Sequence, residues 1–151
     1  MFKLRIVAVG KRGRDEWDPL IEKYIKRSRS MLPIELLIVR NMDALIQEVS
    51  APFALFDERG VAFDSVQFAS RVKQFRERGQ RTFDFAIGDA YGFPAQFKEQ
   101  AEERLALSSF TLPHRLAQLV AVEQLYRAGT ILTGHPYHHG DESKNSIKLP
   151  T

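Results

Sequence analysis

Hydrophobic and polar positions follow two different periods along this chain. Short apolar runs with the length and composition of β-strands occur at KLRIVAVG (3–10), IELLIVR (34–40) and PFALFDERG (52–60). Longer segments space their apolar residues three and four positions apart, as amphipathic helices do; these segments are 15–29, 43–49, 65–79, 94–105 and 114–129. Because the two kinds of segment alternate, the pattern predicts an α/β fold with a mostly parallel sheet flanked by helices on both faces.

Individual residues predict where several of these elements begin and end. Asp15 is expected to open the first helix, while Ser65 is expected to cap the helix that ends at Gly79. TFDFAIGDAYGF (82–93) reads as a fourth strand that runs into a glycine-bearing turn. ALSSFTL (106–112) is expected to be a short fifth strand or a loop.

Size and composition predict one globular domain. The chain has 151 residues, of which 44% are apolar and 27% charged. We expect residues 1–139 to form the domain and residues 140–151 to be a disordered tail. The absence of cysteine excludes disulfides and thiolate metal sites and suits a reducing compartment, so we expect a cytoplasmic protein. The N-terminal apolar run is too short to span a membrane.

Charge permits a polyanionic partner without requiring one. The formal net charge is +3 and the sequence pI is about 9.3. Basic residues cluster at 11–14, 26–29 and 71–81, each near the end of a predicted element. One such cluster is usually a solvated face, but three together favour a surface for the phosphate backbone of RNA.

Three strand ends differ from ordinary connectors: FDERG (56–60), IGDAYGF (87–93) and LSSFTLPH (107–114). In open α/β sheets ligands bind beyond the carboxyl ends of the strands, so we expect these segments to share one crevice. The chain contains neither GxGxxG nor GxxxxGK[ST], which disfavours a Rossmann dinucleotide site and a P-loop.

The residues of these segments leave alternatives open. LSSFTLPH could line a site for a flat heteroaromatic ring held by backbone hydrogen bonds, or it could be a buried strand before a helix, with Thr111 as a possible N-cap. In FDERG, Asp57 and Glu58 could act as a general base, although a charged turn is the simpler interpretation. The histidines of GHPYHHG (134–140) lack HExxH spacing and a carboxylate motif. We therefore expect no metal site there, and favour an RNA-contacting surface or a neutral imidazole over a merely solvated end.

The segment HRLAQLVAVEQLYRAG (114–129) predicts the longest helix. Its apolar surface is broader than packing against one core requires, so it favours a subunit interface.

Taken together, FALFDERG, AIGDAYGF, LSSFTLPHRL, EQLYRA and HPYHH resemble the motifs of the RlmH (YbeA-like) family of SPOUT methyltransferases, in order and spacing, over residues 1–139. The resemblance implies a homodimer that uses S-adenosylmethionine to methylate N3 of a pseudouridine in large-subunit (23S) ribosomal RNA. It also implies a C-terminal trefoil knot, an exception to the rule that chains are unknotted. No membrane or DNA partner is implied. Two alternatives are a SPOUT tRNA methyltransferase and a non-catalytic RNA-binding factor in ribosome assembly.

Matching the motifs residue by residue gives the site that the resemblance implies. His138 and Tyr137 would be catalytic, with His138 as the candidate base, and His139 and Arg127 would contact RNA. The cofactor would be bound by residues of three segments: Phe56, Gly88, Leu107, Ser108, Ser109, Phe110, Thr111 and Leu112. Two positions depart from the family, since Asp89 stands where a second glycine is usual and His139 where many relatives carry Arg. The chain also continues beyond PYHH, where relatives tend to stop.

Overall fold

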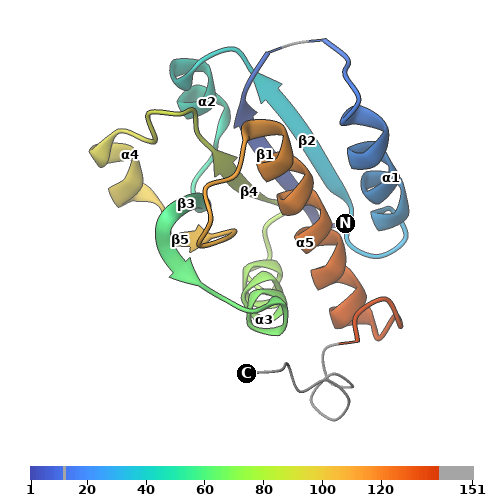
Figure 1. Cartoon of the computed structure of the whole chain (residues 1–151). Coiled ribbons are helices and arrows are strands. Elements are labelled where there is room, and N and C mark those ends of the chain that lie inside the picture. Colours follow the sequence, from blue (N-terminus) through green and yellow to red (C-terminus); the bar gives the residue numbers. More distant parts are fainter. Residues whose placement is uncertain (12, 140–151) are drawn as a thin grey trace, which may run out of the picture.

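A parallel five-stranded sheet is the centre of the fold in the computed structural model, which describes residues 1–11 and 13–139 (Figure 1). Its order is β2-β1-β4-β3-β5. The strands are β1 (Lys3–Val9), β2 (Ile34–Val39), β3 (Phe53–Ala62), β4 (Thr82–Ile87) and β5 (Glu103–Ala106). The predicted tail, 140–151, and one member of the first basic cluster, Arg12, lie outside the described residues.

Helices cover both faces of the sheet, which confirms the predicted α/β architecture. One face carries α1 (Asp18–Ser28), α3 (Ser65–Arg76) and α5 (His114–Thr133), and the other carries α2 (Met42–Glu48) and α4 (Ala95–Gln100). In Figure 1, α5 crosses the front of the sheet between α1 and α3, and it contacts both. The alternation of β1 explains the two layers, because Leu4 and Ile6 face α5 while Val7 faces α2.

An aromatic cluster fixes α3 against the sheet. The ring of Phe75 stacks on Phe83 with centroids 3.9 Å apart, and both rings meet Phe85 edge to face. All three side chains are fully buried. Such pairs contribute about 0.5–1.5 kcal/mol each beyond burial of their area, so this cluster is a main anchor of the central strand β4.

Two predicted helix starts were wrong. α1 begins at Asp18, and the Asp15 side chain instead accepts a hydrogen bond from the Trp17 amide at 3.0 Å. α3 is capped by Asp64 and not by Ser65, since the Asp64 carboxylate forms a capping box with Gln67. At α3 two adjacent residues could cap the helix and the local sequence pattern does not decide between them, whereas the N-cap of α1 is Trp17 and makes no side-chain capping bond.

Two predicted helix ends were also wrong. α3 ends at Arg76, before Gly79, whose φ of +79° belongs to the link that follows. α4 ends at Gln100 and not at 105, because residues 103–106 pair with β3 as the edge strand β5. The fifth strand therefore precedes LSSFTL, which is a loop. The pairing partner, which is remote in sequence, decides this assignment over local helical spacing.

The FDERG segment is part of β3 and not a charged turn. β3 continues to Ala62, and its pairing with β5 shifts register between Phe56 and Val61. Gly60 permits this bulge, because a Cβ atom there would lie 2.7 Å from backbone atoms of Arg104 and Leu105. Because of the bulge, the charged residues 57–59 have no strand partner in β5, and they lie at the carboxyl edge of the sheet, beside β4.

A buried ion pair joins β1 and β4 on the face covered by α2. The Arg5 Nε atom lies 3.0 Å from Asp84 Oδ1, and Asp84 Oδ2 accepts a hydrogen bond from the Ser50 amide at 3.0 Å. Burial raises the pKa of Asp84, which these two partners partly offset. The pair fixes the register of β1 and β4 at a distance from the loops that follow the strands.

Candidate functional site

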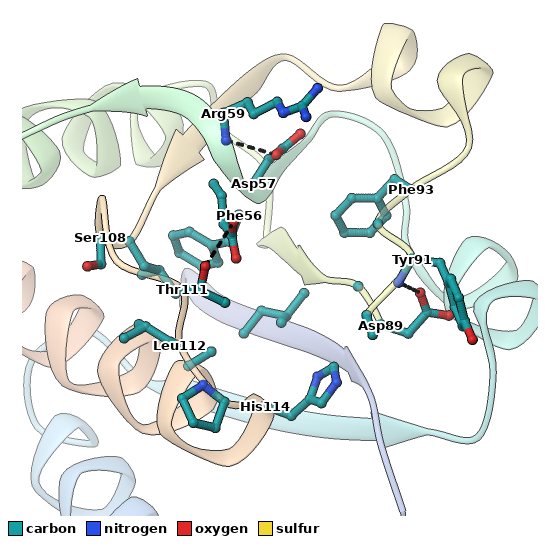
Figure 2. Close-up of a pocket in the computed structure, with 18 of the residues that line it drawn as sticks. Phe56, Asp57, Arg59, Asp89, Tyr91, Phe93, Ser108, Thr111, Leu112 and His114 are labelled. Atoms are coloured by element: carbon teal, nitrogen blue, oxygen red, sulfur yellow. Dashed lines mark hydrogen bonds between the residues drawn. The ribbon is translucent and has the colours of Figure 1, made fainter.

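The three predicted strand ends meet in one cavity of about 620 Å³ at the carboxyl edge of the sheet (Figure 2). This confirms that they share a crevice. The volume is within the range of small-molecule sites. Seven of the eight residues predicted to bind a cofactor line the cavity: Phe56, Gly88, Leu107, Ser108, Phe110, Thr111 and Leu112. Ser109 is exposed and does not line it.

Gly88 and Phe93 shape one wall of the cavity. A Cβ atom at Gly88 would lie 3.2–3.3 Å from three atoms of the Phe93 ring. The small residue therefore lets the ring of Phe93 pack against the end of β4, where it is nearly buried. A side chain at position 88 would displace this ring or occupy the cavity.

Carboxylates surround the cavity. Asp57 Oδ2 lies 3.5 Å from Lys98 Nζ, and Glu58 Oε2 accepts a 3.4 Å hydrogen bond from the Thr111 hydroxyl. Asp89, the departure from the glycine usual in the family, accepts a hydrogen bond from the Tyr91 amide at 2.9 Å. Three acids against two basic residues, Arg59 and Lys98, leave the lining with a net negative charge, which favours a ligand with a positive charge.

The loop before α5 offers unpaired backbone groups to the cavity. Pro113 is the N-cap of α5, so Thr111 does not cap the helix. Within the described residues, no backbone hydrogen bond involves the N–H or C=O groups of Thr111 or Leu112. Both residues line the cavity, so these groups can bind the polar edge of a flat ring.

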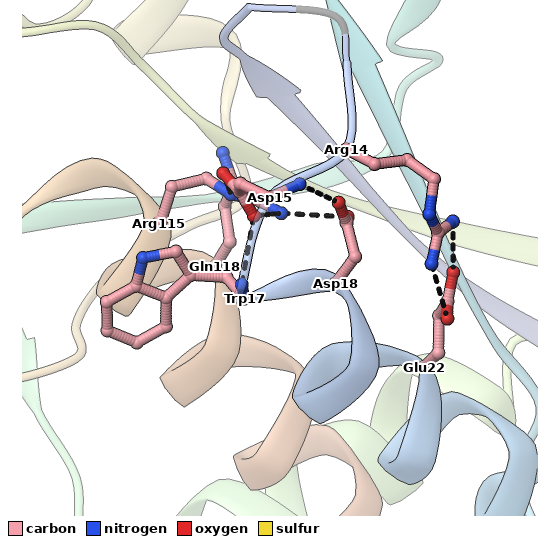
Figure 3. Close-up of polar contacts among 7 residues, drawn as sticks. All are labelled: Arg14, Asp15, Trp17, Asp18, Glu22, Arg115 and Gln118. Carbon is pink, nitrogen blue, oxygen red and sulfur yellow. Dashed lines mark hydrogen bonds and ion pairs between the residues drawn. The ribbon is translucent and has the colours of Figure 1, made fainter.

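An ion-pair network attaches the start of α5 to the segment before α1 (Figure 3). The Arg115 guanidinium donates two hydrogen bonds to Asp15, at 2.9 and 3.0 Å, and one to Asp18 at 2.8 Å. Hydrogen bonds from Arg115 hold the pKa of Asp15 below its ordinary range. Because His114 and Ala117 line the cavity on either side of Arg115, this network positions one wall of the cavity.

The predicted catalytic residues belong to a second polar cluster at the other end of α5. Glu123 Oε2 accepts a 2.6 Å hydrogen bond from the Tyr137 hydroxyl and a 2.7 Å bond from Arg127. The Arg127 guanidinium also covers the Tyr137 ring, 4.8 Å from its centroid, and lies 3.0 Å from His138 Nδ1. The segment after α5 is thus folded back onto the helix.

These contacts fix the protonation of both predicted catalytic residues. Burial raises the pKa of Tyr137, and its bond to Glu123 raises it further, so Tyr137 remains a hydroxyl at neutral pH. A guanidinium has no acceptor, so Arg127 must donate to His138 Nδ1, and a neutral His138 ring carries its proton on Nε2. Arg127 therefore occupies the Nδ1 lone pair of His138, while Nε2 is buried without a hydrogen-bond partner among the described residues.

Within one chain the cavity and this cluster are separate. Ala117 lines the cavity, and Arg127 follows it ten residues later on the same helix, about 15 Å along the axis at 1.5 Å per residue. His139 is exposed beyond the cluster. The structure therefore groups the predicted cofactor residues together and the predicted catalytic and RNA residues together, in two different places.

Comparisons with known proteins agree with this architecture. Residues 2–138 match the family described as "Predicted SPOUT methyltransferase". Ribosomal RNA large subunit methyltransferase H of Anaeromyxobacter dehalogenans (strain 2CP-C) is 43% identical, with 91% of this chain and 99% of that protein aligned. The protein of the same name from Koribacter versatilis (strain Ellin345) is 37% identical, with 92% and 99% aligned. The chain belongs to the RlmH family of SPOUT methyltransferases.

One solved structure shares the fold of this RlmH-family chain. It is described as "The structure of a probable methylase family protein from Haemophilus influenzae Rd KW20", and it aligns with a TM-score of 0.54. The alignment covers 99% of this chain and 72% of that one at 9% identity, so it supports the fold alone. Within the described residues, no helix combines the length and apolar character needed to cross a bilayer.

Reasoning from the sequence missed three residues that organise the two clusters of this RlmH-family chain. Glu123 joins Tyr137 to Arg127, and Arg115 joins α5 to Asp15. Two signals pointed to Glu123: it begins the EQLYRA motif, and it stands four residues before Arg127, which places both side chains on one helix face. Asp15 and Arg115 are 100 residues apart, and no local pattern links them.

Proposed function

We propose that this protein transfers the methyl group of S-adenosylmethionine to N3 of a pseudouridine in large-subunit (23S) ribosomal RNA, at the position of the 1915 type. The observation that carries the proposal is the cavity at the strand ends, lined by seven matched motif residues, in a chain of the RlmH family. The name of the relatives, Ribosomal RNA large subunit methyltransferase H, supports rRNA as the substrate class.

The volume of the cavity and the groups that line it support this cofactor. S-adenosylmethionine supplies, when bound, a methyl group on a positively charged sulfur. The unpaired backbone groups of Thr111 and Leu112 would bind the adenine edge, while Asp57, Glu58 and Asp89 provide negative charge for the sulfonium side. Gly88 would keep the wall beside the ligand open.

Tyr137 and His138 would act on the RNA side of the reaction. N3 of the target base must lose its proton at or before methyl transfer, and we assign that proton to His138. His138 can accept it only after its contact with Arg127 is released, so RNA binding would have to reposition the ring. Tyr137, which remains a hydroxyl, would orient the base by stacking or hydrogen bonding.

The separation of the two clusters is consistent with a homodimer. Because α5 holds Tyr137 and His138 well away from the cavity of the same chain, they would serve the cavity of a second copy. We propose that the broad apolar surface of α5 forms the subunit interface. We also propose that the chain has the trefoil knot of the family. His139 and Arg127, together with the basic clusters at 11–14, 26–29 and 71–81, would face rRNA phosphates.

Calorimetric titration with S-adenosylmethionine tests whether the protein binds this cofactor. We expect one molecule to bind per chain in the wild type, and Gly88→Leu to abolish binding because its side chain would fill the cavity. No heat of binding to the wild-type protein would refute the cofactor assignment and leave the non-catalytic RNA-binding alternative. His138→Ala should bind the cofactor normally.

Methyl incorporation from labelled cofactor then identifies the substrate. We expect label in 23S rRNA from ribosomes or large subunits, strongly reduced incorporation for His138→Ala, and no label in tRNA. Label in tRNA alone would favour the alternative SPOUT tRNA methyltransferase. Mapping of the methylated base to a position other than N3 of a pseudouridine would contradict the specific assignment.

A further inference from the structure

Two aromatic side chains at the cavity are mostly exposed, unlike all others in the protein. The sequence has 11 Phe, 4 Tyr and 1 Trp, and all of them fall within the described residues. Fourteen are buried or partly buried; the two exceptions are Tyr91, which is 96% exposed, and Phe110, which is 79% exposed. Both line the same cavity, from opposite loops. Scattered exposed apolar residues are ordinary, but aromatic exposure confined to one cavity indicates a binding surface.

Similar turns hold the two aromatic residues at the cavity. Asp89 Oδ1 accepts a 2.9 Å hydrogen bond from the Tyr91 amide, and Gly92 closes this turn with a φ of +76°. Ser108 Oγ likewise accepts a 2.9 Å bond from the Phe110 amide. In each loop the amide of the aromatic residue is bound by a side chain two positions earlier. Figure 2 shows Tyr91 on the outer side of its turn, across the cavity from Thr111.

The charge around the cavity restricts what these rings can bind. Acids outnumber bases among the lining residues: Asp57, Glu58 and Asp89 stand against Arg59 and Lys98. Because Lys98 is paired with Asp57, a phosphate group at the mouth would meet little positive charge. A nucleobase is neutral, and its face stacks on an aromatic ring whatever the base. An RNA substrate could therefore enter here base first, with its phosphates directed to basic surfaces elsewhere.

We propose that Tyr91 and Phe110 form a stacking pair that receives bases of the RNA substrate at the mouth of the cavity. One ring on each loop would hold the target base, or the base next to it, over the site of methyl transfer. This inference rests on the proposed function. It gives an RNA-binding role to Tyr91, which lies in the AIGDAYGF motif without a predicted role, and to Phe110, which the LSSFTLPH motif had assigned to the cofactor. It also gives Asp89 a role, because its carboxylate fixes the turn that presents Tyr91.

Four single variants test the stacking pair. Tyr91→Ala and Phe110→Ala remove one ring each, and Tyr91→Phe keeps the ring while losing the hydroxyl. Val66→Ala is the matched control, because Val66 is 45% exposed on α3 and does not line the cavity. Binding is measured by co-sedimentation with purified ribosomes and large subunits, and cofactor affinity is measured by calorimetry with S-adenosylmethionine.

We expect each alanine variant to bind ribosomal particles about 5- to 100-fold more weakly, the range for loss of one stacked base. Tyr91→Phe and Val66→Ala should match the wild type, and Tyr91→Ala should keep the wild-type cofactor affinity. Phe110 also belongs to the predicted cofactor site, so particle binding by Phe110→Ala is measured at a saturating concentration of S-adenosylmethionine. Unchanged particle binding by both alanine variants, or no particle binding by the wild type, overturns the inference. A parallel loss of cofactor affinity would instead assign the rings to the cofactor wall, and dissociation to monomers on size exclusion would assign them to a second copy.

The outcomes separate this inference from the proposed function. If the wild type transfers no labelled methyl group to ribosomes, the proposed function fails. Co-sedimentation still tests the stacking pair. Particle binding that is weakened by the alanine variants and preserved by Tyr91→Phe supports the pair. Particle binding that the alanine variants leave unchanged refutes it.

Discussion

Gly60→Ala is predicted to disrupt the edge of the sheet that supports the cavity. The added Cβ would lie 2.7 Å from the carbonyl carbon and oxygen of Arg104 and from the amide nitrogen of Leu105. These are backbone atoms of β5, so no side-chain rotation can relieve the contact. The two strands must separate by several tenths of an ångström, which costs about 1–3 kcal/mol of the free energy of unfolding.

The matched control is Gly10→Ala, whose Cβ would meet only side-chain atoms, at 3.2 Å from Ile38 and 3.5 Å from Gln118. Both substitutions restrict the unfolded chain equally, so their difference isolates the clash with β5. For a chain of this size we expect the Tm of Gly60→Ala to be about 2–12 °C below that of Gly10→Ala.

Thermal unfolding followed by circular dichroism measures this difference. Calorimetry with S-adenosylmethionine adds a functional reading, because β5 leads directly into the loop that lines the cavity. We expect Gly60→Ala to bind the cofactor more weakly and Gly10→Ala to bind it normally. Equal Tm values and equal cofactor affinities for the two variants would refute the reasoning about the bulge.

Three further predictions concern the two ends of α5. Arg115→Gln should lower the free energy of unfolding, measured by urea titration, because it breaks the hydrogen bonds to Asp15 and Asp18. A stability equal to the wild type would contradict this. The pKa of Asp15 is lowered in the folded protein, so the stabilisation it provides is present above its ordinary pKa of 3.8 and is lost as pH falls through the lowered value. Urea titrations between pH 2 and 5 should therefore show a smaller acid-induced loss of stability in Arg115→Gln than in the wild type, and identical pH profiles would argue against the linkage. Tyr137→Phe removes a hydrogen bond to the charged Glu123, and we expect at least about tenfold slower methyl transfer with unchanged cofactor affinity; full activity would exclude a role for the hydroxyl.

The sequence predicted those parts of the fold that local patterns determine. Apolar periodicity located β1, β2, β4 and α5, because buried strands and amphipathic helices have different periods. It misassigned residues 103–106, which read as the end of a helix and form the edge strand β5. That strand exists because it pairs with β3, some 50 residues earlier in the chain, and no local window contains this information.

The candidate site also has a part that the sequence predicted and a part that it did not. The rule that ligands bind beyond the ends of parallel strands predicted that Phe56, Gly88 and LSSFTLPH would share one crevice, and they line one cavity. The distance from that cavity to Tyr137 and His138 was not predictable, because it depends on the direction and full length of α5. The same holds for Tyr91 and Phe110, whose exposure is a property of the folded surface.

Because α5 is a continuous helix, the number of residues between its two clusters sets the distance and the angle between them. A single residue inserted between Ala117 and Glu123 would advance the second cluster by about 1.5 Å and rotate it by about 100° about the helix axis. All the side chains would be retained. However, Glu123 and its partner Tyr137 would point in a different direction relative to His114 in the cavity wall. The length of this segment therefore determines where the second cluster lies relative to the cavity. Insertions and deletions should be confined to the loops around α5.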